Sequence, residues 1–260
     1  MSTSEADADL ERLRQAAAQG DADARLSIAA GLLYKAATAD EVTDAIAWLR
    51  KVAEEDGVTP SLARYAQIYL GTLYWGGERH FIHRHNPALK RLLAPDSQAA
   101  LKWYRMAADK GSDEASLYIG ELYEEGTPAT PKNLPEAFQW YTRATRDGTY
   151  GIWQLAEMHF HGRGVKRNYV EAARLYRASH SRRAWLRLGW MAENGKGVLQ
   201  DLAEAHKWFN LASEDDEEAI REEGSAGRTR VEGAMTAAQK SDAWARYETF
   251  KDEIRARAGA

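Results

Sequence analysis

The chain repeats one short pattern of residues, and this periodicity constrains its fold more than any other feature of the sequence. Each copy places a small residue next to an aliphatic residue, followed by leucine or methionine and usually by tyrosine. The copies are Ala30–Tyr34, Leu70–Tyr74, Ile119–Tyr123, Leu155–His159 and Leu188–Ala192. The small residues Gly120, Ala156 and Gly189 are 36 and 33 residues apart. This spacing is typical of repeats built from two helices.

A second pattern lies between these copies and pairs alanine with a large side chain three residues later. Its copies are Ala45 with Trp48, Ala100 with Trp103, Ala137 with Trp140, Ala172 with Leu175 and Tyr176, and Ala205 with Trp208. Both patterns have the spacing of a helix with one apolar face; Ala115, Tyr118, Ile119 and Leu122 are an example. Each repeat is therefore predicted to be a pair of packed helices, here named helix A for the first pattern and helix B for the second.

The ends of the predicted helices carry recognisable signals. The spacing Asn/Asp-x-x-Glu before helix B predicts a reciprocal capping box at Asn133 and Glu136, Asn168 and Glu171, and Asp201 and Glu204. Glycines in the segments 162–165 and 195–198 are expected to end helix A in a turn that needs positive φ.

The two ends of the chain differ from the repeats and are expected to cap them, because a terminal repeat would otherwise expose its apolar face. Residues 1–23 hold a polar N-terminal capping helix, and residues 24–213 form the repeat region with an insertion at about 77–96. Residues 214–260 are expected to be an acidic linker and a C-terminal capping helix that begins with Thr236 and Gln239. The acidic run 213–223 and the small residues 224–227 predict that this linker is mobile.

The run from Gly120 to Gly148 and the two Gly-x-Gly-Val turns resemble the Sel-one-like repeats, which are relatives of the tetratricopeptide repeats. The resemblance covers roughly residues 24–213 in five copies. It implies an all-α fold, a right-handed solenoid of antiparallel helix pairs, and a role as an adaptor or scaffold that binds other proteins. The first copy lacks the Gly-x-Gly-Val turn, and the fourth has His159 in place of tyrosine.

Composition excludes several classes of function. The chain has no cysteine, which excludes disulfides, thiolate nucleophiles and cysteine-bearing zinc sites. A formal charge of -4 argues against nucleic acid as the partner.

The polar, acidic start and the lack of a long apolar stretch lead us to expect a cytoplasmic protein that does not enter a membrane. Because no nucleotide-binding, nucleophile or metalloprotease motif is present, we expect no enzyme activity and no cofactor.

The residues that flank the apolar stripe of helix A are the predicted binding surface, on the hypothesis that helix A lines the concave face of the solenoid. They run from acidic in the third repeat to basic in the fifth, which would orient a bound protein or peptide by charge. Trp190 is notable because threonine or glutamate stands at its position elsewhere. The predicted residues are Tyr65, Tyr69, Thr72, Glu114, Tyr118, Glu121, Glu125, Tyr150, Gln154, Glu157, His161, Arg183, Arg187, Trp190 and Asn194.

The insertion in the second repeat supports a different hypothesis. His80, His83 and His85 lie close together and suggest a zinc or nickel site. Arg79 and Arg84 argue against a metal and favour a plain exposed basic loop. Together with Lys90 and Arg91 the loop makes a positive patch, which suits phosphate or an acidic partner as well as the histidines suit a metal. A third hypothesis is an immunity or chaperone-like protein that sequesters its partner. The sequence does not define the oligomeric state.

Overall fold

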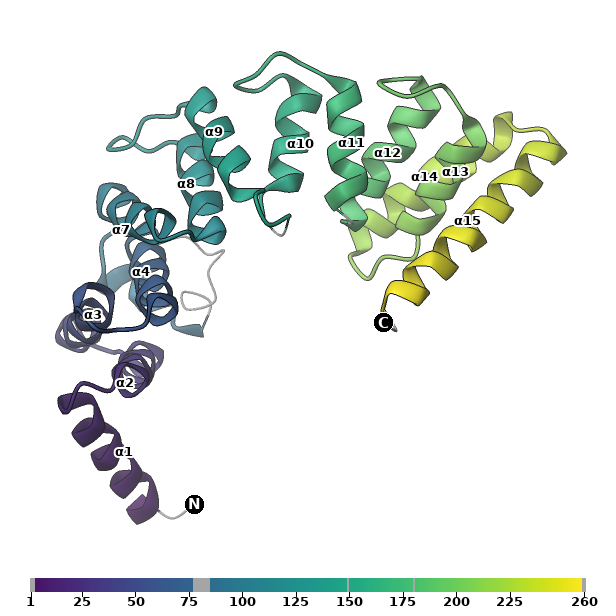
Figure 1. The fold of residues 1–260 in the computed structure, drawn as a ribbon. Coiled ribbons are helices and arrows are strands. Elements are labelled where there is room, and N and C mark those ends of the chain that lie inside the picture. The colour runs from purple at the N-terminus through teal and green to yellow at the C-terminus, as the bar shows by residue number, and fades with distance from the viewer. Residues whose placement is uncertain (1–2, 77–84, 149, 180, 259–260) are drawn as a thin grey trace. The chain divides into compact units, whose positions relative to one another are not determined.

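A computed structural model describes residues 3–76, 85–148, 150–179 and 181–258 of the chain. Over these ranges the secondary structure is helical and contains no strand, which confirms the predicted all-α class (Figure 1). The chain divides into two compact units, Met1–Ala144 and Thr145–Ala260.

Unit 1 begins with an N-terminal helix that packs against α2. The longer helices that follow each pack on the next long helix, and the short helix α6 packs on α3. Its helices are α1 (Thr3–Ala18), α2 (Ala22–Lys35), α3 (Ala39–Glu54), α4 (Pro60–Trp75), α6 (Leu89–Leu92), α7 (Ser97–Asp109), α8 (Asp113–Glu125) and α9 (Leu134–Ala144). Leu33, Leu49 and Leu70 are buried where α2, α3 and α4 meet. The pairs α2/α3, α4/α7 and α8/α9 correspond to the first three predicted repeats.

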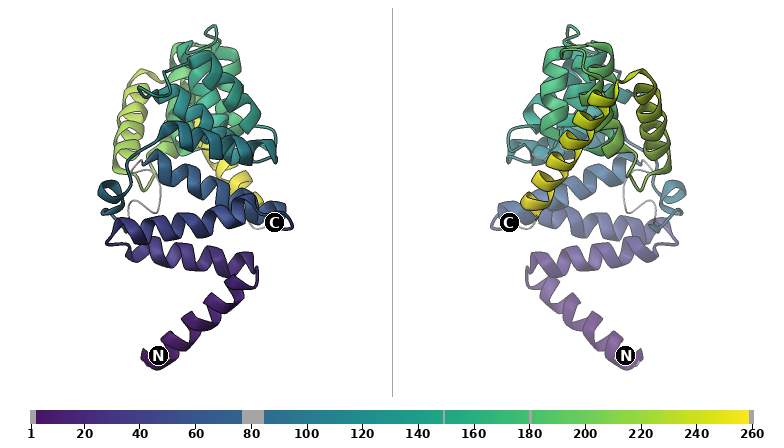
Figure 2. Two further views of the ribbon diagram at one scale, coloured as in Figure 1. Left: turned by 90° about the vertical axis from the view of Figure 1, so that its left-hand side faces the viewer. Right: turned by 90° about the vertical axis from the view of Figure 1, so that its right-hand side faces the viewer.

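Unit 2 continues the same plan with two helix pairs and adds two further helices after them. Its helices are α10 (Ile152–His161), α11 (Tyr169–Ser179), α12 (Arg182–Asn194), α13 (Leu202–Ala212), α14 (Glu218–Ala234) and α15 (Ala237–Ala258). Both α14 and α15 pack against α13, and α15 is the long yellow helix of Figure 2. Ala243 and Tyr247 of α15 are buried, whereas Trp244 is exposed. No helix within the described residues is both long enough and apolar enough to cross a membrane.

The two helices of a repeat approach closely at the small residue of helix A. A Cβ atom built on Gly71 would lie 2.5 Å from Tyr104 Cε1, and one on Gly120 would lie 2.5 Å from Tyr141 Cε1. These tyrosines stand four residues after Ala100 and Ala137, so the two sequence patterns meet at this point. The glycines therefore make room for an aromatic ring of helix B.

The register predicted for the first repeat is wrong by two residues. Gly31 is exposed, and nothing lies within 4 Å of a Cβ built on it. Ala29 is fully buried and stands eight residues after the N-cap Asp21, as Gly120 does after Ser112. The stretch Ala30–Tyr34 resembles the pattern in composition but points a different set of side chains into the core.

The three predicted capping boxes are single caps. The side chain of Asn133 accepts from Glu136 N at 3.1 Å, and that of Asn168 accepts from Glu171 N at 3.1 Å. The backbone N–H of each cap residue already donates to the end of helix A, from Asn133 to Tyr123 O at 2.8 Å and from Asn168 to His159 O at 2.9 Å. The glutamates therefore make other contacts; Glu136 accepts from the Trp140 indole at 2.9 Å.

The predicted signals elsewhere are confirmed. Thr236 and Gln239 make both bonds of a capping box, at 2.9 and 3.3 Å. Gly162 and Gly195 end α10 and α12 in the left-handed conformation, with φ of 70° and 61°.

Most of the mobile linker predicted for residues 213–227 is instead the start of a packed helix, because residues 218–227 belong to α14 and residues 213–217 form the short connection before it. A Cβ on Gly224 would lie 2.6 Å from Ser213 N, and one on Gly227 would lie 2.6 Å from Phe209 Cδ1. The small residues thus allow α14 to cross α13 at close range. Glycine has this role in helix packing as well as in loops, and the sequence pattern alone does not separate the two roles.

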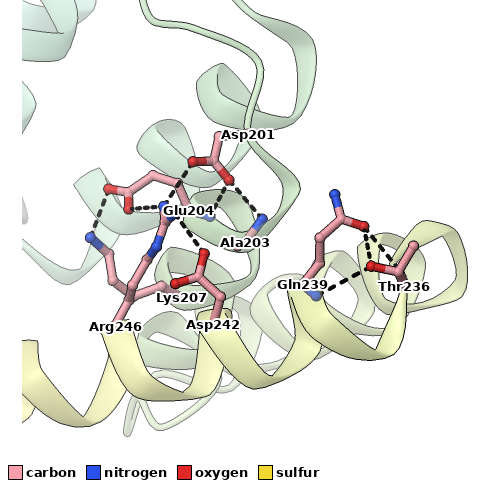
Figure 3. A network of polar contacts seen from close by, with 8 residues as sticks. All are labelled: Asp201, Ala203, Glu204, Lys207, Thr236, Gln239, Asp242 and Arg246. Atoms are coloured by element: carbon pink, nitrogen blue, oxygen red, sulfur yellow. Dashed lines mark hydrogen bonds and ion pairs between the residues drawn. The ribbon is translucent and has the colours of Figure 1, made fainter.

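A polar network joins α15 to the start of α13 (Figure 3). Asp201 caps α13 by accepting from Ala203 N at 2.9 Å and Glu204 N at 3.0 Å. Its second oxygen lies 2.7 Å from Arg246 of α15, and Arg246 also contacts Asp242 at 2.6 Å. The Asp201 carboxylate therefore caps the N-terminus of α13 and also connects α13 to α15 through Arg246.

We expect Asp201→Ala to lower the free energy of unfolding by about 1–2 kcal/mol, since an N-cap is worth about 0.5–2 kcal/mol and a partly exposed ion pair less than about 1 kcal/mol. Asp201→Asn keeps the cap acceptor and removes the charge, so it should lower the free energy of unfolding by clearly less than Asp201→Ala does. Urea unfolding of the two variants measures both contributions. Equal losses would show that the ion pair with Arg246, and not the cap, accounts for the effect.

Candidate protein-binding faces

The tyrosine hydroxyls of helix B each bond a polar side chain of helix A. Tyr104 lies 3.2 Å from the Thr72 hydroxyl, Tyr141 donates to Glu124 at 2.6 Å, and Tyr176 donates to Glu157. Thr72 and Glu157 were predicted to contact a ligand, but both are buried and serve as partners for these hydroxyls.

The fifth repeat has a phenylalanine at the corresponding helix B position, Phe209, which has no hydroxyl to satisfy. Trp190 stands one residue after Gly189, as Thr72 stands after Gly71 and Glu157 after Ala156. Because Phe209 needs no hydrogen-bond partner, the residue after Gly189 can point to solvent. This residue is Trp190, which is 37% exposed.

Glu157 is the centre of a charged network in unit 2 that joins α10, α11 and α12. Besides the Tyr176 hydroxyl, its carboxylate accepts from Arg187 Nε at 2.9 Å and Nη2 at 3.3 Å. His161 Nε2 lies 3.3 Å from the same carboxylate. Burial raises the pKa of Glu157, but the hydrogen bonds from Arg187 and Tyr176 and the charges of Arg187 and His161 outweigh it and leave the pKa below its ordinary value.

Three aromatic rings, those of Phe160, Tyr169 and Trp190, lie beside the Glu157 network. The Phe160 ring lies 5.3 Å from the Trp190 ring, and the Arg187 guanidinium lies 5.2 Å from the Phe160 ring centre. Tyr169 packs 5.3 Å from Phe160. We name the surface made by Phe160, His161, Tyr169, Arg187 and Trp190 the Trp190 face. Its arginine is fixed by a buried carboxylate, and its tryptophan rests on a largely buried ring.

A shallow groove of about 240 Å³ lies beside Arg187, between α10, α12 and the start of α14. Trp153, Leu186 and Ile220 line it, and Arg183 pairs with Glu217 at 3.0 Å across it. Arg183, predicted as a binding residue, therefore also ties α12 to α14.

The other residues predicted on helix A of unit 2 take different positions. Tyr150 stands before the start of α10 and, like Gln154, is half-buried. Asn194 is exposed and donates to Trp190 O at 2.8 Å.

The residues predicted on helix A of unit 1 form a separate group. Tyr65 is 56% exposed, and its ring lies 6.0 Å from that of the half-buried Tyr69. The Tyr118 hydroxyl donates to Glu114 at 3.0 Å, and its ring lies 5.2 Å from that of Tyr104. Glu121, also on α8, is half-buried and Glu125 is exposed.

Two important aromatic residues, Trp75 and Phe160, were not predicted from the sequence. Each stands four residues after the small residue of its helix A, Gly71 or Ala156, and each contacts the helix B tyrosine of its repeat. Comparing this single position across repeats would have revealed both, because the third and fifth repeats carry Glu124 and Glu193 there.

The histidine insertion is only partly within the described residues, since His80 and His83 lie outside them. His85 is exposed, with its ring 6.2 Å from that of Tyr34. The expectation of an exposed basic loop is met only in part by the segment that follows. Lys90 and Arg91 are exposed but lie in the short helix α6, and Asn86 is buried and donates to Leu33 O and Ala36 O at 2.9 Å each. Among the described residues, no three histidine or acidic side chains are grouped to hold a metal ion.

The geometry defines a class of protein, an α-helical repeat protein built from successive helix pairs. A family model described as the Sel1 repeat matches residues 90–112, 113–148, 149–179 and 184–217. These residues belong to the Sel1 repeat family, which confirms the resemblance inferred from the sequence. The helix pair α2/α3 and helix α4 precede the matched region.

Known proteins agree with this assignment. The chain is 34% identical over 127 residues to protein sel-1 homolog 2 of Rattus norvegicus, covering 46% of the chain and 18% of that protein. It is 30% identical over 144 residues to the ERAD-associated E3 ubiquitin-protein ligase component HRD3A of Arabidopsis thaliana, covering 50% of the chain and 21% of that protein. The chain thus matches about a fifth of the length of these relatives.

A crystal structure of a Sel1 repeat protein from Oxalobacter formigenes is similar with a TM-score of 0.52 and 25% identity, covering 68% of each chain. The family model and this structure both describe a helical repeat protein.

Proposed function

We propose that this chain is a non-enzymatic protein-interaction module and that it binds a partner protein through the Trp190 face of unit 2. The proposal is supported by the membership of residues 90–217 in a family of interaction scaffolds and by relatives that include a component of a ubiquitin-ligase assembly.

The observation that carries the proposal is the exposed Trp190 on a pre-arranged support. Tryptophan and arginine are enriched among the residues that dominate binding energy at interfaces. Here Trp190 rests on Phe160, and Arg187 beside it is held by two hydrogen bonds to Glu157. Because these side chains are already fixed, binding costs little of the conformational entropy that ordering a flexible surface would require.

The test is affinity capture with the immobilised chain, comparing the wild type with Trp190→Ala. We expect the proteins retained by the wild type to fall at least about tenfold with the variant, since truncating a central interface residue costs about 2 kcal/mol or more. Quantitative mass spectrometry measures the retained proteins, and circular dichroism confirms that the variant is folded.

Leu199→Ala is the matched control, because Leu199 is 91% exposed in the turn between α12 and α13 and lies outside the Trp190 face. It should retain the same proteins as the wild type. Equal capture by Trp190→Ala and the wild type would rule out this face as the binding surface.

A further inference from the structure

Two grooves in unit 1 lie on successive repeats and are lined by equivalent residues. One of about 820 Å³ lies between α3, the end of α4 and Leu93, and one of about 580 Å³ lies between α7, the end of α8 and residues 129–131. Counted from Ala45 in α3 and from Ala100 in α7, the same positions of helix B line both grooves. Three equivalent pairs are Ile46 and Leu101, Arg50 and Arg105, and Glu54 and Asp109.

In each groove an exposed arginine of helix B donates to a tyrosine hydroxyl of the following helix A. Arg50 Nη2 lies 3.1 Å from the Tyr74 hydroxyl, and Arg105 Nη2 lies 2.7 Å from the Tyr123 hydroxyl. Each bond uses one of the five N–H donors of a guanidinium group. The tyrosine therefore orients the arginine and leaves it donors for a carboxylate in the groove. We name these two sites the arginine–tyrosine grooves.

The combination of arginine and tyrosine is confined to these two places in the sequence of the repeats. Helix B of the third repeat has Thr142 at the arginine position, and helix A of the fourth has His159 at the tyrosine position. The fourth repeat has Arg177 in helix B, but helix A of the fifth has Ala192 at the tyrosine position. The repeat folds without this bond elsewhere, so the fold alone does not explain its presence in two successive grooves.

A lysine adds a second positive charge to each groove. In the first groove Lys51 Nζ lies 4.4 Å from the centre of the Trp48 ring. In the second groove Lys102 Nζ lies 5.6 Å from the centre of the Trp103 ring. The indole faces attract these ammonium groups and hold them beside the grooves.

The carboxylates of the grooves do not cancel this charge. The first groove contains Glu54, and at its edge the buried Arg25 pairs with Glu55, so that pair is neutral as a whole. The second groove contains Asp109, which lies 3.4 Å from Arg143 of α9. Each groove therefore has a net positive charge, although the whole chain has a formal charge of -4.

Two features of the grooves favour a protein segment over a nucleic acid. Apolar side chains line both of them, Ile46 in the first and Leu101 and Met106 in the second. Glu54 and Asp109 would repel a chain that carries a phosphate on every nucleotide. A peptide can place a small or apolar residue beside these carboxylates and an acidic residue beside the arginine.

We propose that the arginine–tyrosine grooves bind an acidic, extended segment of a partner protein. One carboxylate of the segment pairs with Arg50 and another with Arg105, because equivalent positions of successive repeats offer an extended chain the same contact twice. The positive grooves and the acidic segment are complementary in charge. The grooves belong to unit 1 and are separate from the Trp190 face, so this proposal does not depend on that face.

The test measures fluorescence anisotropy of a labelled six-glutamate peptide with the full chain, beside a six-arginine peptide of the same length. We expect the glutamate peptide to bind and the arginine peptide not to bind, although the formal charge of the chain favours the reverse. Arg50→Gln and Arg105→Gln should each weaken binding of the glutamate peptide about tenfold. Tyr74→Phe and Tyr123→Phe remove only the orienting hydroxyl and should weaken it about threefold, with circular dichroism showing that the variants are folded.

Arg177→Gln is the matched control. Arg177 is an exposed arginine at the same position of helix B, in a repeat that is followed by Ala192 and not by tyrosine. Its replacement removes the same charge and should leave the affinity for the glutamate peptide unchanged. Trp190→Ala should also bind this peptide as the wild type does, so that failure of the Trp190 face and failure of this proposal are distinguishable.

Several results would overturn the proposal. One is a glutamate peptide that does not bind, and another is unchanged affinity in the Arg50 and Arg105 variants. An equal loss in Arg177→Gln would show binding by diffuse positive charge. Tighter binding of a six-nucleotide single-stranded DNA than of the glutamate peptide would show that the grooves select a nucleic acid and not an acidic protein segment.

Discussion

Replacing Gly224 by alanine should destabilise unit 2 by about 3 kcal/mol, the upper part of the range for overpacking. A Cβ at this position would lie 2.6 Å from Ser213 N and 2.8 Å from Ala212 C, and both are backbone atoms of the segment that ends α13. Backbone cannot rotate away as a side chain can, so α14 would have to move off α13. Thermal and urea unfolding of the variant measure the loss.

Gly233→Ala provides the control in the same helix. Nothing lies within 4 Å of a Cβ at Gly233, which is exposed within α14. Alanine there should raise stability by about 0.5–1 kcal/mol, because it restricts the unfolded chain and favours the helix. If residues 224–227 were a linker, both variants would be neutral or stabilising, so a gain in Gly224→Ala would disprove the packed helix.

The glycines show how far the sequence predicts this fold. Repetition gave the helix pairs and located Gly71 and Gly120 correctly, because several copies agree on the same position. Gly31 matches the sequence pattern of the repeat but lies on the surface. Gly224 has the sequence context of a linker but lies where α14 crosses α13. Where a glycine stands alone, its neighbours in sequence do not reveal which helix approaches it in space.

The positions of the residues in the proposed Trp190 face were predictable to a similar degree. Aligning the repeats predicted that Arg187 and Trp190 lie on helix A. In the structure both residues lie on the Trp190 face together with His161. Register did not show that Glu157 serves the Tyr176 hydroxyl, because that contact depends on the position of another helix. An acidic residue in the correct register can therefore be a structural partner and not a ligand contact.

Glu157→Ala should lower the free energy of unfolding by about 2–3 kcal/mol. Removing one member of a buried ion pair costs about 3–5 kcal/mol, and the value here is reduced because the Arg187 side chain is 36% exposed. Tyr176→Phe removes only the hydroxyl and should cost about 1 kcal/mol. Phenylalanine fits this position, since the fifth repeat has Phe209 there.

The pH dependence of stability tests whether the charge of Glu157 is responsible. The folded-state pKa of this carboxyl is lowered from 4.5, so its contribution is present above about pH 4.5 and is lost as the pH falls through the lower folded value. The difference in unfolding free energy between the wild type and Glu157→Gln should therefore be constant near neutral pH and shrink in acid. A difference that persists undiminished well below pH 4.5 would show that shape and hydrogen bonding, and not charge, hold Arg187 in the Trp190 face.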